Sequence, residues 1–138
     1  MNGVGTRNEE RVRNLFATHN RGPDAMLAAL EEIFAPEIIW SPAVIGGLEG
    51  GSYQGYAGMR RYYADRDDAF KEGQVHVLDV ESVGDDMVVA HVLSTGVGRV
   101  SGASLEQELW MAMWLGEGRV VRWYALPSRA EALEAANS

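Results

Sequence analysis

Three side chains of this sequence could do acid–base chemistry: His91, Glu108 and Tyr53. A histidine titrates near neutral pH, so His91 could give or take a proton. Glu108 could assist it, because burial raises the pKa of a glutamate, and the Tyr53 phenol could hold a carbonyl or hydroxyl group. The alternative for His91 is a buried neutral histidine hydrogen-bonded to a neighbour, and Glu108 could equally lie at an exposed edge.

Aromatic and apolar side chains could form the wall of a binding pocket around these groups. The tryptophans favour a flat, apolar ligand, although they could equally fill a core. Core packing is also an alternative for Tyr63, because Tyr62 and Tyr63 fall at helical spacing. The candidate ligand-binding residues are Phe16, Trp40, Tyr56, Met59, Tyr63, Val89, Trp110, Trp114 and Trp123.

The remaining histidines do not form a metal-binding pattern. His19, His76 and His91 are scattered without ligand spacing, and the sequence has no cysteine. We expect His19 to cap helix carbonyls and His76 to lie on the solvent side of a strand. We therefore expect no metal and no cofactor.

Composition limits the class of partner. A chain of 138 residues forms one domain, 1–138, with an ordered core of about 8–136. A net charge of −8 disfavours nucleic acid and anionic membranes. The sequence contains no run of 18 apolar residues and no leader-like N-terminus, so we expect a cytoplasmic protein.

The longest strand-forming stretch must position His91 and Glu108. Gly and Ser interrupt its apolar pattern only at the joints, which is typical of hairpins. Gly96 and Gly98 predict a bend or bulge in the first long run. The predicted strands are Glu37–Ser41, Val75–Val83, Met87–Val100, Ala103–Leu115 and Arg119–Ala125.

Helices are predicted before and after these strands. Thr6 and Glu9 fit a capping box, and Val12, Leu15, Phe16 and His19 then share one helical face. Further helices are predicted after Pro23, from Ala57 to Lys71, and after a second capping box at Ser128, while Ala43–Gly55 is predicted to be a loop. Helices covering one face of a curled antiparallel sheet make an α+β cone with a pocket at its wide end.

Five local motifs stand out along the chain: Asn20-Arg21-Gly22-Pro23, Phe34-Ala35-Pro36-Glu37-Ile38-Ile39-Trp40, Tyr53-Gln54-Gly55-Tyr56-Ala57-Gly58-Met59-Arg60, Gly118-Arg119-Val120-Val121-Arg122 and Arg129-Ala130-Glu131-Ala132-Leu133-Glu134-Ala135. With the predicted order of helices and strands, they resemble the SnoaL-like proteins of the nuclear transport factor 2-like, or ketosteroid isomerase-like, superfamily. The likeness covers roughly residues 8–136.

The resemblance implies the cone-shaped fold and a range of activities. A ketosteroid isomerase needs a base, a tyrosine and an acid where this sequence has Ser41, Leu15 and Trp110. A limonene-type epoxide hydrolase needs an acid on the last strand, which here offers Trp123-Tyr124-Ala125. We expect neither activity. SnoaL-type cyclases pair an aspartate with a histidine, for which Glu108 and His91 are the nearest candidates.

Strand alternation assigns side chains to the two faces of the sheet. If the hairpin turns at Val100-Ser101, His91 lies opposite Trp110. Guided by the resemblance, we place these two on the concave side with Val89, Trp114 and Trp123. Leu105, Leu109, Met111 and Met113 then form an apolar outer face suited to a homodimer interface. The opposite assignment is nearly as good, because both faces are apolar.

Two main functions follow. The first is a cofactor-independent cyclase, isomerase or dehydratase acting on a small apolar molecule, with His91 as acid/base and Tyr53, Tyr56 or Glu108 assisting. The second is a non-catalytic small-molecule binding or dimerisation module, favoured by the absence of the family's catalytic carboxylates.

Overall fold

The computed structural model describes residues 3–42 and 52–135. The predicted loop Ala43–Gly55 falls largely outside them, apart from Ser52 to Gly55. The elements, in chain order, are α1 (Gly3–His19), α2 (Pro23–Ala28), α3 (Leu30–Ile33), β1 (Phe34–Ser41), β2 (Tyr53–Gln54), α4 (Gly55–Ala69), β3 (Phe70–Val83), β4 (Met87–Gly98), β5 (Ser104–Gly116), β6 (Arg119–Leu126) and α5 (Arg129–Ala135).

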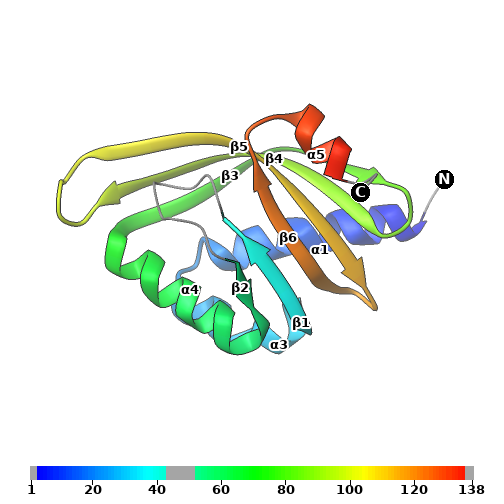
Figure 1. The fold of residues 1–138 in the computed structure, drawn as a ribbon, viewed down its shortest axis with the longest axis horizontal. Helices are drawn as coiled ribbons and strands as arrows, with labels where there is room; N and C mark the ends of the chain where they lie inside the picture. Colours follow the sequence, from blue (N-terminus) through cyan, green and yellow to red (C-terminus); the bar gives the residue numbers. More distant parts are fainter. Residues whose placement is uncertain (1–2, 43–51, 136–138) are drawn as a thin grey trace.

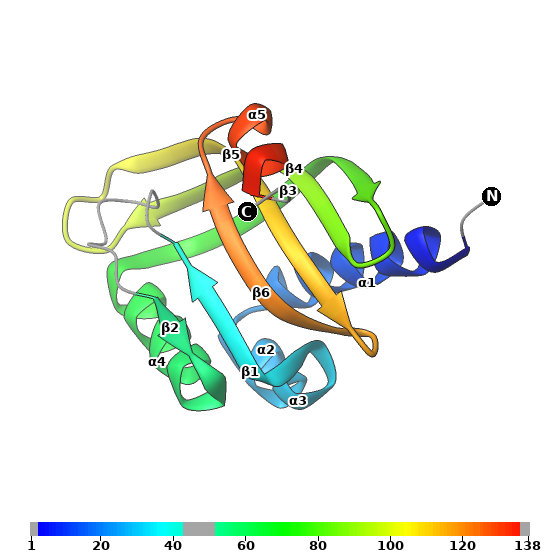
Figure 2. The ribbon, with the colours of Figure 1, turned by 45° about the vertical axis from the view of Figure 1, so that its right-hand side comes forward.

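The strands form one six-stranded sheet in the order β2-β1-β6-β5-β4-β3. β1 runs parallel to β6, and the other neighbouring pairs are antiparallel. The sheet curls over α1 and α4 without closing, and α5 lies against its opposite face (Figure 1, Figure 2). The expected α+β architecture, a curled sheet covered by helices, is confirmed.

The main core lies between the inner face of the sheet and the helices. Removing these apolar side chains from water stabilises the fold by about 1.5–3 kcal/mol for each large one. From the central strands β4 and β5, the core receives Val88, Ala90, Val92, Leu109, Met111 and Met113. A second, smaller cluster on the outer face joins Met87, Val89 and Ala112 to Ala132 of α5.

The predicted cross-strand pairing is confirmed, but the face assignment on β4 and β5 was wrong. His91 pairs with Trp110, yet both belong to the outer face together with Val89 and Trp114. Leu109, Met111 and Met113, assigned to a dimer interface, lie in the core. The sequence could not separate the faces because α5 covers part of the outer one, so both are apolar.

The pairing is irregular within β3, within β6, and between Phe34 and Ile39 of β1. β4 pairs with β5 without interruption through Gly96, but its pairing with β3 is irregular there, between Val97 and Thr95, and the extra residue belongs to β3 rather than to β4. β3 instead carries an extra residue between Lys71 and Gln74, and another between Val77 and Asp79. A further extra residue in β6 turns both Val120 and Trp123 toward the core.

One of the two predicted capping boxes is present. Ser128 Oγ accepts a hydrogen bond from the backbone N–H of Glu131 (3.2 Å) and donates one to the Glu131 carboxylate (2.9 Å), which caps α5. At the other end of the chain, α1 already begins at Gly3, so Thr6 is not its N-cap. Glu9 accepts a hydrogen bond from Ser82 Oγ (2.6 Å) and so ties α1 to β3.

Candidate functional site

The predicted catalytic pair forms on the outer face of the sheet. His91 Nε2 lies 2.6 Å from Glu108 Oε1, and the His91 ring stacks on Trp110 with centroids 4.3 Å apart. The two side chains remain 27% and 54% exposed. The prediction that His91 and Glu108 are neighbours is therefore correct, but the pair lies on the outer face of the sheet and not on the predicted concave face. Water can reach both groups there.

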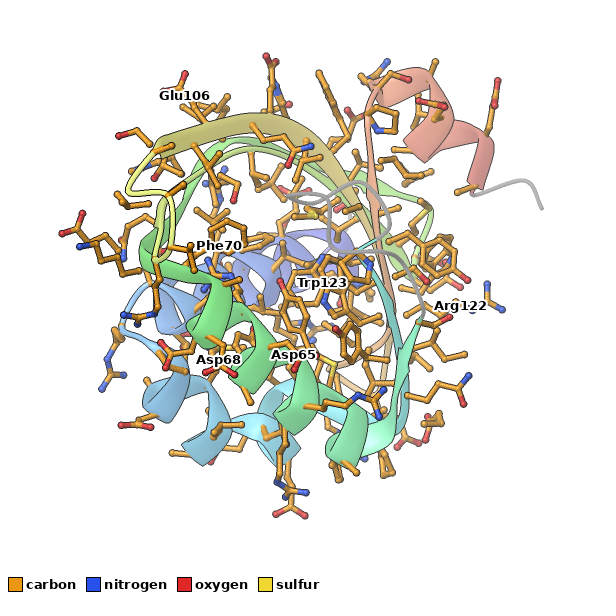
Figure 3. The ribbon with its side chains drawn as sticks, turned by 60° about the vertical axis from the view of Figure 1, so that its left-hand side comes forward. Asp65, Asp68, Phe70, Glu106, Arg122 and Trp123 are labelled. Carbon is orange, nitrogen blue, oxygen red and sulfur yellow. The ribbon has the colours of Figure 1, made fainter. Side chains whose placement is uncertain are left out.

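Five predicted ligand-binding residues meet on the inner side. Phe16, Trp40, Met59, Tyr63 and Trp123 are each at most 2% exposed and belong to the main core. The Trp40 and Trp123 rings stack with centroids 3.9 Å apart. Figure 3 shows Trp123 inside the fold and the neighbouring Arg122 directed away from it. Several of these aromatic side chains therefore pack against one another in the core.

Tyr53 and Tyr56 lie near the start of α4 and use their hydroxyl groups within the fold. Tyr53 donates to Asp65 Oδ2 (3.0 Å), and burial, followed by this carboxylate, raises its pKa. Tyr56 donates to the Phe34 carbonyl (3.0 Å) and fastens α4 to β1. Both phenols already donate their proton to an acceptor within the fold. Neither is therefore free to donate to a ligand, which is the role that the sequence suggested for them.

A different pair of polar side chains meets in the interior. His19, the last residue of α1, places Nδ1 3.1 Å from the Tyr63 hydroxyl. His19 is 4% exposed, and its Nε2 has no hydrogen-bond partner among residues 3–42 and 52–135. The capping role expected for His19 was wrong. The available signal was its place on the apolar stripe of α1, which predicts burial.

Burial fixes the protonation of this pair at neutral pH. Desolvation, helped by the nearby Arg66 charge, lowers the pKa of His19 to about 3, so the imidazole is neutral. Desolvation also raises the pKa of Tyr63 well above 10, so the phenol keeps its proton. If that phenol donates to Nδ1, the ring hydrogen of His19 sits on Nε2 and is available as a donor.

A second orphaned donor belongs to β1. The indole Nε1 of Trp40 is buried and has no partner with full hydrogen-bond geometry within the described part of the chain, although it lies close enough to the Tyr62 hydroxyl to lower the pKa of that phenol against the larger, raising effect of burial. Trp40 contacts the ring of Tyr62 edge to face, and Tyr62 contacts Tyr63 in the same way. A continuous run of aromatic rings therefore connects Trp40 to His19. Buried polar groups are almost always paired, so two orphans on one run are unusual.

Asn20 fixes the position of His19. Its side chain donates to the Val75 carbonyl (2.8 Å) and accepts from the Val75 N–H (2.7 Å). Gln74 returns a hydrogen bond to the Asn20 carbonyl (3.1 Å). The end of α1 is thus clamped to the first bulge of β3, and the adjacent imidazole is held against Tyr63.

The arrangement of the side chains and helices also bears on metal binding and on membrane insertion. Within residues 3–42 and 52–135, no three histidine or carboxylate side chains come together as a metal site would require. Over the same residues, no helix is long and apolar enough to cross a membrane.

Comparison with known proteins places the fold. The family described as "SnoaL-like domain" matches residues 12–123. No curated protein matches the chain in sequence. A protein from Jannaschia sp. CCS1 assigned as a SnoaL-like polyketide cyclase superposes with a TM-score of 0.77 at 20% identity, covering 99% of this chain and 94% of its own.

Two further structures share the fold at similar distance. SalBIII, an epoxide hydrolase/cyclase-like enzyme of pyran ring formation in salinomycin, has a TM-score of 0.74 at 15% identity and covers 91% of this chain and 93% of its own. TerC, co-crystallised with polyporic acid, has a TM-score of 0.72 at 18% identity, and the match covers 96% of this chain and 99% of TerC. At these identities the likeness establishes the fold alone.

Proposed function

This chain belongs to the SnoaL-like domain family, and on that premise we propose that it binds a small, largely apolar molecule and catalyses a cofactor-independent cyclisation, isomerisation or dehydration of it. The observation that carries the proposal is the buried Nε2 of His19, which, like the buried Nε1 of Trp40, has no hydrogen-bond partner among residues 3–42 and 52–135. Leaving such a group unsatisfied costs about 1–3 kcal/mol. A ligand oxygen would satisfy it.

The chemistry follows from the charge state of His19. A neutral imidazole is a hydrogen-bond donor toward a carbonyl oxygen rather than a strong base. Negative charge develops on that oxygen when a carbonyl compound enolises, and N–H donors that the fold holds in place stabilise it. Enolisation is the shared first step of many cyclisations and isomerisations. The α-proton, made more acidic in this way, can leave to water.

Deuterium exchange tests this activity without knowledge of the natural substrate. The probe is 2-tetralone in D₂O, with proton loss beside the carbonyl followed by NMR. We expect the protein to accelerate exchange and His19→Gln to reduce the acceleration about 10²-fold, as for loss of one oxyanion donor. Failure of the wild-type protein to accelerate exchange would contradict the catalytic proposal.

A matched variant separates the inner site from the outer one. The catalytic roles predicted for His91 and Glu108 remain predictions, and their 2.6 Å pairing keeps them the rival candidates. We expect His91→Gln to leave tetralone exchange unchanged. The reverse pattern, with His91→Gln inactive and His19→Gln active, would move the site to the outer face.

A binding module without catalysis is the second candidate. The low pKa of His19 favours it, because such an imidazole is a weak base. In that case tetralone would change the tryptophan fluorescence in a saturable way and be recovered without deuterium beyond the background level.

A further inference from the structure

A cavity of about 180 Å³ lies where the end of α1 meets the end of α4 and the first bulge of β3. Its lining includes the buried side chains of His19 and Tyr63, together with Gly73 and Gln74 of β3. His19, whose buried Nε2 has no hydrogen-bond partner among the described residues, is thus one of the residues that line the cavity. The volume exceeds that of a single water molecule several-fold.

The charge of this cavity is opposite to that of the protein. Its lining contains four cationic side chains, Arg21, Arg66, Lys71 and Arg99, and two carboxylates, Asp67 and Glu72. The chain as a whole carries −8. A concave site whose charge opposes its surroundings concentrates ions of the complementary sign, here anions.

One of these cations, Arg99, is already paired with a carboxylate. Arg99 forms an ion pair with Asp67 (3.2 Å), and its Nε also donates to the Asp67 carbonyl. Arg66 differs, because within the described part of the chain no carboxylate lies at ion-pair distance from it. Its positive charge instead lowers the pKa of three nearby rings. For His19 this adds to the effect of burial, and for Tyr62 and Tyr63 it opposes the effect of burial.

The backbone beside the guanidinium is shaped for it. A Cβ at Gly73 would lie 2.6 Å from one terminal nitrogen of Arg66. Glycine at this position therefore lets the guanidinium lie directly over the β3 bulge. The neighbouring Glu72 adopts φ 56°, in the left-handed region that non-glycine residues seldom occupy. The bulge that carries the cavity is thus held in an unusual conformation next to an uncompensated cation.

We propose that this cavity is an anion subsite in which Arg66 binds the carboxylate of the ligand while His19 faces the oxygen nearest to it. The inference rests on the proposed function and narrows its ligand class to small apolar organic acids. A planar guanidinium matches a carboxylate with two parallel hydrogen bonds. Arg21 and Lys71 at the exposed rim add attraction without fixed geometry.

The test compares three probes at constant ionic strength: benzoate, its neutral isostere benzamide, and inorganic phosphate. Calorimetry gives the affinities, and the ¹⁵N signals of the Arg66 Nε–H and the His19 ring report the place of binding. We expect benzoate to bind at least about 10-fold more tightly than benzamide or phosphate and to shift both signals. Equal affinities for benzoate and benzamide would overturn the subsite, and tighter binding of phosphate would overturn the organic-acid class.

Three variants sharpen this test. Arg66→Met should remove the preference for benzoate over benzamide. Gly73→Ala should weaken the preference by displacing the guanidinium, which is the mobile end of a flexible side chain. Arg60→Met removes an exposed cation from the same helix and serves as the matched control. A benzoate preference that survives Arg66→Met in a folded protein would overturn the assignment.

The two proposals can fail separately. The probe 2-tetralone carries no carboxylate, so its exchange does not depend on anion binding. Exchange without a benzoate preference would leave the proposed function standing and remove the subsite. A benzoate preference that requires Arg66, without exchange, would leave an anion-binding protein and remove the catalysis.

Discussion

The imidazole of His19 and the phenol of Tyr63 meet in the core, with Nδ1 and the hydroxyl oxygen 3.1 Å apart and the ring centroids 5.6 Å apart. They come from α1 and α4, 44 positions apart in the chain. This hydrogen bond leaves Nε2 as the free end of a neutral, desolvated ring. The proposed chemistry starts from that nitrogen.

Tyr63→Phe should keep the ring and remove only the hydroxyl. His19 Nδ1 then becomes a buried polar atom without a partner, which costs about 1–3 kcal/mol in the free energy of unfolding. We expect tetralone exchange to fall as well, because the tautomer of His19 is no longer fixed. Urea unfolding and the exchange assay measure the two effects. Tyr124→Phe, at a half-buried phenol of the outer face, is the control.

The stability of the protein should depend on pH through His19. The unfolded imidazole binds a proton below about pH 6.5, and the folded one only near pH 3. Between these values the unfolded state binds more protons, so the free energy of unfolding falls as pH decreases, by about 1.4 kcal/mol for each pH unit. Above pH 6.5 the contribution is complete and constant.

Urea unfolding at pH 7, 6 and 5 measures this effect as the difference between the wild type and His19→Gln. Carboxylates titrate in both proteins and cancel. Parallel pH profiles would contradict the burial of a neutral His19.

Asn20→Ala should loosen the clamp between α1 and β3. The Val75 N–H and carbonyl lose their partner, and we expect a loss of about 1–3 kcal/mol in the free energy of unfolding. The His19 ring signals should broaden in the NMR spectrum, since the adjacent residue no longer holds the helix end. Asn14→Ala, at an exposed position of α1, should change neither quantity.

The homodimer remains a prediction, but with different residues. Trp110, Trp114 and Tyr124 are half-buried on the outer face and only partly covered by α5. Sedimentation at micromolar concentration should show a dimer that Trp114→Lys dissociates. The same change at Leu78, 54% exposed on the edge strand β3, should not dissociate it. A wild-type monomer would rule out this interface.

The sequence by itself determined the elements that depend on local patterns. The meander of β4, β5 and β6, the pairing of His91 with Trp110 and the Ser128 cap all follow from hairpin joints, side-chain alternation and capping chemistry. Each of these involves residues close in sequence or in register, so the local signal suffices. The family motifs predicted the remaining part of the fold, the cone formed by the sheet and its helices.

Only the tertiary structure decided which face of β4 and β5 is inside. Both faces are apolar, because the helices cover one and α5 covers part of the other, so alternation carried no preference. Likewise, only the tertiary structure shows that His19 of α1 and Tyr63 of α4 are hydrogen-bonded to each other. The apolar stripe of α1 predicts that His19 is buried, but the sequence does not show that its imidazole meets Tyr63, because the two residues lie 44 positions apart.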